Sequence, residues 1–257
     1  VLRIEDTDQK RYVEGAVDNL LKTLDWVGLT YDEGPNQGGN HGPYIQSERT
    51  DLYREHAEIL LKKSHAYHCF CTAERLEEMR EKQTKAKQAP MYDRTCLKLS
   101  PTEIEKNLTE KIPSVIRLKI PHGRKLSFKD HIRGIVTFDS NTIDDQVLMK
   151  SDSFPTYHLA NVVDDHFMQI THVIRGEEWL PSTPKHIFLY EAFGWKPPEY
   201  AHLPLLLNAD KTKLSKRQGD VSVEDYINKG YSREAIINFI AMLGWHPGGG
   251  EEQEIFS

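Results

Sequence analysis

Apolar residues recur along the chain with two periods, one typical of strands and one typical of amphipathic helices. Residues 1–4 form a short β-branched run that predicts a half-buried strand. Apolar positions then repeat at spacings of three and four over 13–27, and Gly28 follows, which predicts a helix with a glycine stop. A second helix is expected over 47–63. A strand followed by helices indicates an α/β unit.

The pattern changes over residues 65–149. A highly charged helix is expected over 74–87, and residues 100–103 have the order of a capping box, with proline at the first helical position. Short β-type runs follow at 115–120, 135–138 and 146–149. We interpret 65–149 as an α+β insertion within the α/β domain.

The α/β pattern resumes after the insertion. The spacing predicts helices over 155–166 and 183–193, a strand over 170–175, and a buried parallel strand over the apolar run 202–207. A basic loop and a helix over 232–243 come later. The expected fold is a Rossmann-type α/β domain with a parallel sheet, an α+β insertion and the start of a helical domain. The expected segments are 1–64, 65–149, 150–208 and 209–257.

Composition excludes several classes of protein. The chain has 257 residues and no run of about 18 apolar residues, so no membrane-spanning helix is expected. Its formal net charge of -6 means that any contact with nucleic acid must be local. Three cysteines, an odd number, argue against a disulfide framework and fit a reducing compartment or a metal site.

A basic loop is the strongest local signal for chemistry. Residues 213–220 read Lys-Leu-Ser-Lys-Arg-Gln-Gly-Asp, which places three cations within five residues beside a hydroxyl and a glycine. Lysine supplies a mobile point charge and arginine a planar fork, and both suit phosphoryl oxygens. From composition alone, a solvated basic loop is an equally good interpretation. No P-loop or dinucleotide-binding fingerprint is present.

This octapeptide resembles the Lys-Met-Ser-Lys-Ser signature of class I aminoacyl-tRNA synthetases, in the form common in their glutamyl branch. Residues 2–8, Leu-Arg-Ile-Glu-Asp-Thr-Asp, look like the family's first-strand motif. Residues 154–166 resemble its central helix, and 172–179 the strand and turn that follow. Glutaminyl relatives typically read Phe-Asp-Asp-Thr-Asn where this chain has residues 4–8, so the four ordered motifs favour the glutamyl branch.

The resemblance implies ATP-dependent ligation of glutamate to tRNA-Glu through a glutamyl-adenylate, with Mg²⁺ accompanying ATP. The implied catalytic residues, which would steady the phosphates, are Lys213, Lys216 and Arg217. The implied ATP-binding residues are Glu178, Lys213, Ser215 and Lys216. The implied glutamate-binding residues are Glu5, Tyr157, Asn161, Arg175 and Trp179.

These side chains suit a substrate with one ammonium and two carboxylates. By resemblance Glu5 accepts the α-ammonium, although a surface carboxylate at a strand end is the alternative. Tyr157 and Asn161 are four residues apart on a predicted helix, so they share one face. Arg175, at the carboxyl end of a predicted strand, can clamp a carboxylate in bidentate fashion. Trp179 fits a pocket wall or a core position equally well.

A salt bridge from Arg175 to Glu177 or Glu178 is the alternative to substrate binding.

The cysteines form a Cys-x-Cys pair, Cys69 and Cys71, followed by Cys96, with Tyr92 four residues before it. Zinc takes four ligands, usually cysteine or histidine. Some glutamyl enzymes have a histidine two residues after the last cysteine, where this chain has Lys98. A tyrosine ligand, as in a related glutamyl-Q enzyme, would complete the set through Tyr92. The alternative is buried or free thiols.

The resemblance places binding of the tRNA-Glu acceptor stem in the insertion. Cations on the helix predicted over 74–87 are candidates for phosphate contacts: Arg75, Arg80, Lys82, Lys85 and Lys87. They are interleaved with glutamates, so a solvated helix face is favoured for most of them. We expect a monomer. The motif sequences resemble those of mitochondrial enzymes of bacterial type, so we expect localisation to the mitochondrial matrix, with the bacterial cytoplasm as the alternative.

The chain begins at Val1 rather than Met and lacks the family's His-x-Gly-His segment. We therefore expect a fragment, with half of the ATP site before Val1 and an anticodon-binding domain after Ser257, which leaves its activity by itself open. Two alternatives remain: a glutamyl-Q tRNA-Asp synthetase, which modifies a tRNA base, and a non-catalytic tRNA-binding paralogue.

Overall fold

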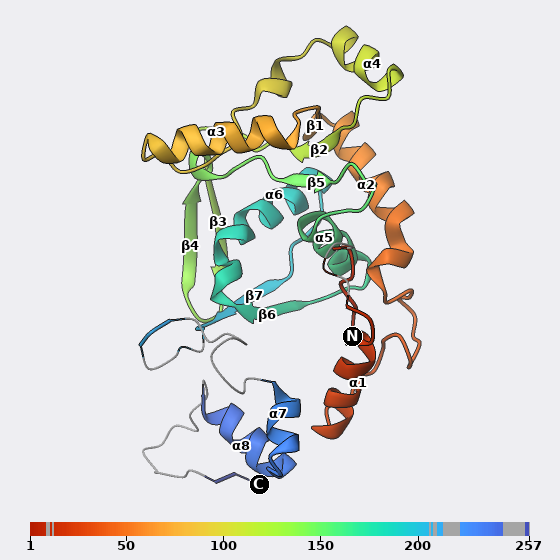
Figure 1. The fold of residues 1–257 in the computed structure, drawn as a ribbon, viewed down its shortest axis with the longest axis vertical. Helices are drawn as coiled ribbons and strands as arrows, with labels where there is room; N and C mark the ends of the chain where they lie inside the picture. Colours follow the sequence, from red (N-terminus) through yellow and green to blue (C-terminus); the bar gives the residue numbers. More distant parts are fainter. Residues whose placement is uncertain are drawn as a thin grey trace.

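The computed structural model describes residues 1–8, 11, 13–205, 207, 210–212, 222–243 and 255–256. It has two sheets with helices packed between and around them (Figure 1). Helices α5 (Tyr157–Phe167) and α6 (Thr183–Phe193) lie in the middle, and α2 (Thr50–Lys62) runs along one side. No helix among the described residues is long and apolar enough to cross a membrane.

The larger sheet has the order β4-β3-β7-β6. Its strands are β3 (Lys125–Asp130), β4 (Gly134–Asp139), β6 (His172–Gly176) and β7 (Glu199–Leu203). Strands β6 and β7 pair in parallel over their whole length, β3 pairs in parallel with β7 at Asp130 and Tyr200, and β4 is antiparallel. The predicted α/β class with a parallel sheet is confirmed, with an antiparallel edge strand.

The smaller sheet is antiparallel, with the order β1-β2-β5. Its strands are β1 (Ala66–Cys69), β2 (Val115–Leu118) and β5 (Val147–Met149). Most of its pairing lies inside the segment that we expected to be an insertion. However, β3 and β4 of the same segment belong to the larger sheet, so strand pairing joins the insertion to the frame that carries β6 and β7.

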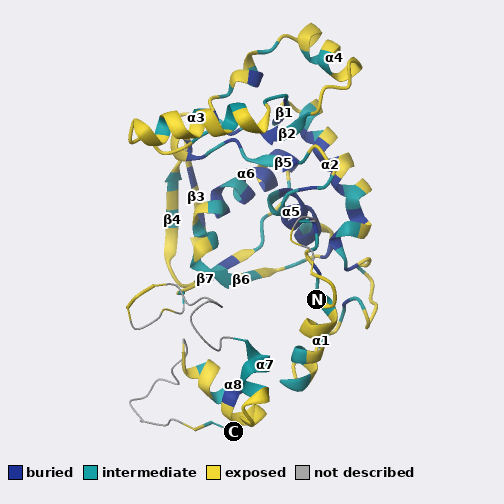
Figure 2. Cartoon of the chain, in the orientation of Figure 1, coloured by how far each residue is buried: buried dark blue, intermediate teal, exposed yellow. Residues whose placement is uncertain are grey.

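The main core fills the space between the two sheets and the central helices. Helix α5 buries Leu159, Ala160, Val162 and Val163, and α6 buries Phe188, Leu189 and Tyr190. Leu60 of α2 and Leu118 and Leu148 of the smaller sheet complete the same cluster. Figure 2 shows this burial concentrated on α5 and α6, whereas α3 and α4 are largely exposed. Burial of these apolar side chains is the main driving force for this arrangement.

The remaining helices lie further out. They are α1 (Ala16–Trp26), α3 (Ala73–Lys85), α4 (Pro101–Thr109), α7 (Val223–Asn228) and α8 (Arg233–Met242). Short 3₁₀ turns are η2 (Gln46–Arg49), η3 (Thr95–Lys98), η4 (Ser140–Thr142) and η5 (Glu177–Ser182). The predicted capping box at Ser100 and Glu103 is confirmed. Glu224 of α7 accepts hydrogen bonds from Asn19 and Thr23 of α1, which joins the two ends of the chain.

Two strand predictions were wrong in part. Residues 1–4 make only a single parallel bridge, from Ile4 to Ile45, rather than a strand. Of the strand predicted over 202–207, residues 202 and 203 belong to β7, which starts earlier and buries alternate residues, Tyr200 and His202, rather than both faces. Leu203 and Leu207 are exposed. The outer face of this sheet is therefore open among the described residues.

Helices α5 and α6 also share a partly buried polar contact. Nδ1 of His158 lies 3.0 Å from Nε2 of His186. Burial lowers the pKa of His158 to about 3, with help from the charges of Lys185 and Arg175. The pKa of the fully buried His186 also lies well below its ordinary value, mainly because of burial. Both rings are therefore neutral in the folded protein at neutral pH.

The pH dependence of stability should report this burial. Because the ordinary histidine pKa is 6.5, the unfolded chain binds more protons than the folded chain between about pH 6.5 and about pH 3. The free energy of unfolding should therefore fall as the pH is lowered through this window. The free energy of unfolding, measured by urea denaturation at several pH values between about 7 and about 5, should change less steeply with pH for His158→Gln than for the wild type. His122→Gln, at an exposed site, is the control. The same pH dependence of the unfolding free energy in all three proteins would contradict the burial of a neutral His158 ring.

Candidate active site

The central helix α5 carries two polar side chains on one face at its start. Nδ2 of Asn161 donates a hydrogen bond to the hydroxyl of Tyr157 over 3.2 Å, as their spacing of four residues predicts. Asn161 is buried and Tyr157 is partly buried. Burial raises the pKa of the Tyr157 hydroxyl, so it stays protonated at neutral pH. It therefore retains a proton to donate while its oxygen accepts from two neighbours.

The second of those neighbours is Arg175, near the carboxyl end of β6. Its Nη1 donates to the Tyr157 hydroxyl over 3.0 Å and its Nη2 to Oγ1 of Thr183 over 2.9 Å. Its Nε donates to Nε2 of His202 over 3.1 Å. Glu177, one of the alternative partners, instead pairs with Arg133. Three contacts within the described part of the chain thus hold the Arg175 guanidinium, and they leave two of its five N–H groups for another acceptor.

Aromatic rings form a wall beside this guanidinium. The rings of Tyr157 and Trp179 lie with their centroids 4.3 Å apart. Cζ of Arg175 lies 5.9 Å from the Trp179 ring and 5.8 Å from the Tyr200 ring. Cation–π attraction adds to the hydrogen bonds in such an arrangement. The structure therefore brings together four of the residues predicted to bind glutamate: Tyr157, Asn161, Arg175 and Trp179.

The first segment of the chain joins the site through Arg3, to which sequence reasoning gave no role. Nη1 of Arg3 donates to Asp165 of α5 over 2.8 Å, and its Nη2 donates to Glu5 over 3.0 Å. Burial alone would lower the pKa of Arg3, but the charges of Asp165 and Glu5 raise it above its ordinary value. The carboxylate of Glu5 is thereby tied to the helix that carries Tyr157 and Asn161. Its side chain remains 38% exposed, so it can accept a further ligand.

A buried carboxylate on α5, that of Asp164, binds side chains of η2 and α2 next to the candidate site. Asp164 is fully buried and accepts hydrogen bonds from Arg49, Gln46 and Tyr53 over 2.7, 2.9 and 2.7 Å. The next residue, Asp165, is also buried, and burial raises the pKa of its carboxyl even though Arg3 opposes the shift. The consecutive aspartates of the central motif are therefore structural residues that attach α2 and the first segment to α5.

The predicted nucleotide-binding residues are only partly covered by the structure. Glu178 lies in η5, is exposed, and packs so closely on Gly176 that a Cβ there would collide with its carboxylate. A larger residue at position 176 would therefore displace the exposed Glu178 side chain from this turn. The basic loop residues Lys213, Ser215, Lys216 and Arg217 lie outside the described residues.

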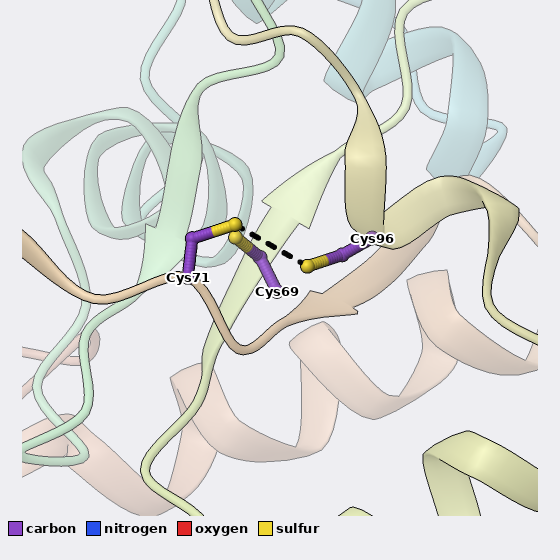
Figure 3. A group of neighbouring side chains, drawn as sticks. All are labelled: Cys69, Cys71 and Cys96. Atoms are coloured by element: carbon purple, nitrogen blue, oxygen red, sulfur yellow. Dashed lines mark hydrogen bonds between the residues drawn. The ribbon is translucent and has the colours of Figure 1, made fainter. Parts of the chain in front are cut away.

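The three cysteines converge at one point beside β1 and η3 (Figure 3). Their sulfur atoms all lie within 4.8 Å of one another, and Cys71 and Cys96 are 3.5 Å apart. The hydroxyl of Tyr92 lies 3.4 Å from Cys69 and 3.3 Å from Cys71. Burial raises the pKa of Cys71 to about 11. The four predicted metal-binding residues are thus adjacent, which sequence spacing alone did not guarantee.

A second group of potential ligands is an ordinary surface cluster. His131, His172 and Glu199 lie together where β3 ends and β6 and β7 begin. All three are exposed, and Glu199 already pairs with His131. Exposed groups of this kind commonly lie together without a metal ion, so we assign this cluster no metal.

The cations predicted on the charged helix are mostly exposed or paired with nearby acidic residues, as expected for a solvated helix face. Arg75 donates to Asp93 and Thr95, and Lys85 lies 3.3 Å from Glu81 one turn away. Arg80 and Lys82 are exposed, as is Lys87, which lies beyond the end of α3 at Lys85, and α3 buries none of its residues fully. The helix therefore has a largely solvated face with interleaved charges.

Comparisons with known proteins agree with this geometry. The sequence profile of the family "tRNA synthetases class I (E and Q), catalytic domain" matches residues 1–257. The chain is 61% identical over 263 residues to a glutamate-tRNA ligase of Chlorobium phaeovibrioides and 59% identical to one of Chlorobaculum parvum. These matches cover 100% of this chain but 50% and 52% of the relatives, so the chain spans about half of their length.

Two solved structures are similar over the whole chain. One is the glutamate-tRNA synthetase of Elizabethkingia anophelis, with a TM-score of 0.91 and 44% identity. The other is a glutamate tRNA ligase of Elizabethkingia meningosepticum in complex with its amino acid, with a TM-score of 0.90 and 44% identity. The chain covers 56% of each.

The relatives named here are bacterial, so the expectation of a mitochondrial protein has no support, and bacterial origin is the alternative that they fit. Motif order, fold and the match over residues 1–257 lead to one conclusion: the chain belongs to the class I tRNA synthetases of the E and Q family, and it comprises catalytic-domain sequence of that family.

Proposed function

We propose that the full-length protein joins glutamate to tRNA-Glu with ATP, through a glutamyl-adenylate. The observation that carries this proposal is the guanidinium of Arg175, held beside Tyr157 and Asn161 at the carboxyl end of a parallel strand. Ligands of open α/β sheets bind at that end of the strands. The names of the similar bacterial proteins support the same substrate.

Each group of glutamate has a matching partner in this proposal. The free N–H groups of Arg175 bind a substrate carboxylate, because a guanidinium offers two parallel donors to a carboxylate. Glu5 accepts from the α-ammonium, while Tyr157 and Asn161 contribute neutral hydrogen bonds. Trp179 excludes water on one side.

Glutamate activation needs positioning and charge neutralisation more than proton transfer, because the attacking carboxylate is already ionised. Lys213, Lys216 and Arg217 steady the phosphates, and Ser215 and Glu178 contribute to the ATP site. Mg²⁺, bound with ATP, would neutralise phosphate charge. The insertion 65–149 contacts the acceptor stem through exposed cations of α3, and the protein acts as a monomer.

Pyrophosphate exchange tests this function. The full-length protein should exchange pyrophosphate into ATP when glutamate and tRNA-Glu are present, and glutamine should not replace glutamate. Arg175→Lys keeps the charge but loses the planar fork, so KM for glutamate should rise about tenfold. Lys216→Ala should lower kcat about a hundredfold, since it removes charge from the reacting phosphates.

Arg124→Lys is the matched control, because Arg124 also makes two hydrogen bonds to a carboxylate, that of Glu191, but on the surface. Its KM for glutamate should stay within about twofold of the wild type. Absence of glutamate-dependent exchange with tRNA-Glu present would rule out the proposed activity and favour a non-catalytic paralogue. Modification of a base in tRNA-Asp would point to the glutamyl-Q alternative.

We also propose that Cys69, Cys71, Cys96 and Tyr92 bind one zinc ion. Zinc–sulfur bonds of about 2.3 Å in a tetrahedron place two sulfur atoms about 3.8 Å apart. The distance of 3.5 Å between Cys71 and Cys96 is close to that value. The guanidinium of Arg117 lies over the Tyr92 ring and interacts with Cys69, but thiols and a phenol are weak hydrogen-bonding groups, and three sulfur ligands with one oxygen suit a zinc ion. Zinc there would hold η3 against β1.

Elemental analysis of the purified protein tests this site. We expect about one zinc per chain, and Cys96→Ser should lose it because a four-ligand site tolerates few substitutions. Tyr92→Phe should weaken retention against a chelator if the phenol oxygen is a ligand. Tyr67→Phe is the control, since the Tyr67 hydroxyl bonds to Asp145 and not to the cysteines. Wild-type protein without zinc, or equal zinc in Cys96→Ser, would refute the proposal.

A further inference from the structure

A line of buried polar side chains runs from β3 through β7 to the guanidinium of Arg175. Asp130 is the last residue of β3 and is 1% exposed, and His202 of β7 is fully buried. Nδ1 of His202 lies 2.6 Å from Oδ2 of Asp130, and Nε2 of His202 lies 3.1 Å from Nε of Arg175. The two ring nitrogens of His202 thus connect a carboxylate on one side with a guanidinium on the other. Nε2 also lies 3.1 Å from Oγ1 of Thr183, which itself accepts from Nη2 of Arg175.

The carboxylate of Asp130 accepts on both of its oxygens. Oδ1 accepts from the backbone N–H groups of Ile132 and Arg133 over 2.9 and 3.0 Å. Oδ2 accepts from the backbone N–H of His202 over 3.1 Å and from its Nδ1. Burial would raise the pKa of Asp130, but these hydrogen bonds lower it. Asp130 is therefore ionised, and an ionised carboxylate requires that Nδ1 of His202 carry a proton.

The other ring nitrogen must then be an acceptor. A neutral imidazole has a single N–H, so with a proton on Nδ1 the Nε2 atom offers a lone pair. Arginine has only donors, so its Nε–H can bond to Nε2 only in this tautomer. Burial lowers the pKa of His202, and the charge of Arg175 adds to the effect, although Asp130 opposes it. The tautomer is assigned from this network of partners.

A change in that tautomer would act directly on Arg175. If Nε2 carried a proton, two N–H groups would face each other across the present contact of 3.1 Å. The guanidinium would then lose its Nε contact, and only the hydrogen bonds to Tyr157 and Thr183 would orient its plane. Bidentate recognition of a carboxylate depends on that plane.

We propose that Asp130 and His202 are positioning residues for glutamate recognition: Asp130 fixes the tautomer of His202, and His202 fixes the plane of the Arg175 guanidinium. This inference rests on the proposed function, in which Arg175 binds a carboxylate of glutamate. It also gives β3, part of the segment between residues 65 and 149, a place in the amino-acid pocket.

The obvious alternative is a purely structural role, in which Asp130 anchors the turn between β3 and β4 and His202 fills space. The two roles use different atoms. The turn depends on Oδ1 of Asp130, whereas Arg175 depends on Nε2 of His202. Substitutions that each preserve one ring nitrogen can therefore separate them.

The test compares His202→Gln with His202→Asn in the full-length protein. Glutamine can place its side-chain oxygen near the position of Nε2 and accept from Arg175. Asparagine can donate to Asp130 in place of Nδ1 but cannot reach Arg175. In glutamate-dependent pyrophosphate exchange, KM for glutamate should rise about tenfold in His202→Asn, because one hydrogen bond to a charged group is lost. It should stay within about threefold in His202→Gln, with KM for ATP unchanged in both.

The opposite order, or equal defects in both variants and for both substrates, would overturn the proposal. A second measurement does not depend on enzymatic activity. Nitrogen-15 spectra of the His202 ring should show a protonated Nδ1 and an unprotonated Nε2 in the wild type. In Asp130→Asn the Nε2-protonated form should appear. A wild-type ring protonated on Nε2 would refute the proposal even if exchange with glutamate is observed, and lack of exchange with the expected spectrum would refute only the proposed function.

Discussion

The buried carboxylate of Asp164 is the constraint on which the rest of this site depends. A charge without partners in the interior costs far more than a hydrogen bond returns, so it must be surrounded by donors. Arg49, Gln46 and Tyr53 supply them from η2 and α2. Removing one partner of such a buried pair costs about 3 to 5 kcal/mol, whereas surface pairs are worth about 1 kcal/mol or less. Asp164 therefore determines where α2 can lie against α5.

The fixed position of α5 also arranges the side chains of the candidate site. Asp165 attaches Arg3 and, through it, Glu5 to the end of α5, while Tyr157 and Asn161 extend from the other end. A hydrogen bond between Arg175 and Tyr157 then joins the helix to the parallel sheet. Two rigid supports, one helix and one sheet, thus hold opposite sides of the same small site. Preorganised groups of this kind are what substrate orientation requires.

Periodicity and motif order predicted the α/β class, most of the helices and four candidate site residues that the structure brings together: Tyr157, Asn161, Arg175 and Trp179. They did not predict β3, because Lys125, Ser127 and Lys129 make it look polar, although the alternating Leu126 and Phe128 were a readable signal. Nor did they assign Arg3, Asp130, Thr183 or His202, whose partners lie far away in the sequence. A long-range pairing between polar side chains leaves no local pattern, so only the fold reveals it. For the Cys69, Cys71 and Cys96 cluster, the sequence predicted which residues are candidate zinc ligands, but only the structure showed that they are adjacent.

The central claim is that Arg175, held by His202, Tyr157 and Thr183, receives a carboxylate of glutamate. A crystal structure of the full-length protein with glutamate bound tests it most directly. We expect a glutamate carboxylate within hydrogen-bonding distance of both terminal nitrogens of Arg175, with Nε still on His202 and Tyr157 and Asn161 beside the ligand. A bound glutamate whose carboxylates contact other groups, with Arg175 engaged only by protein atoms, would contradict the account.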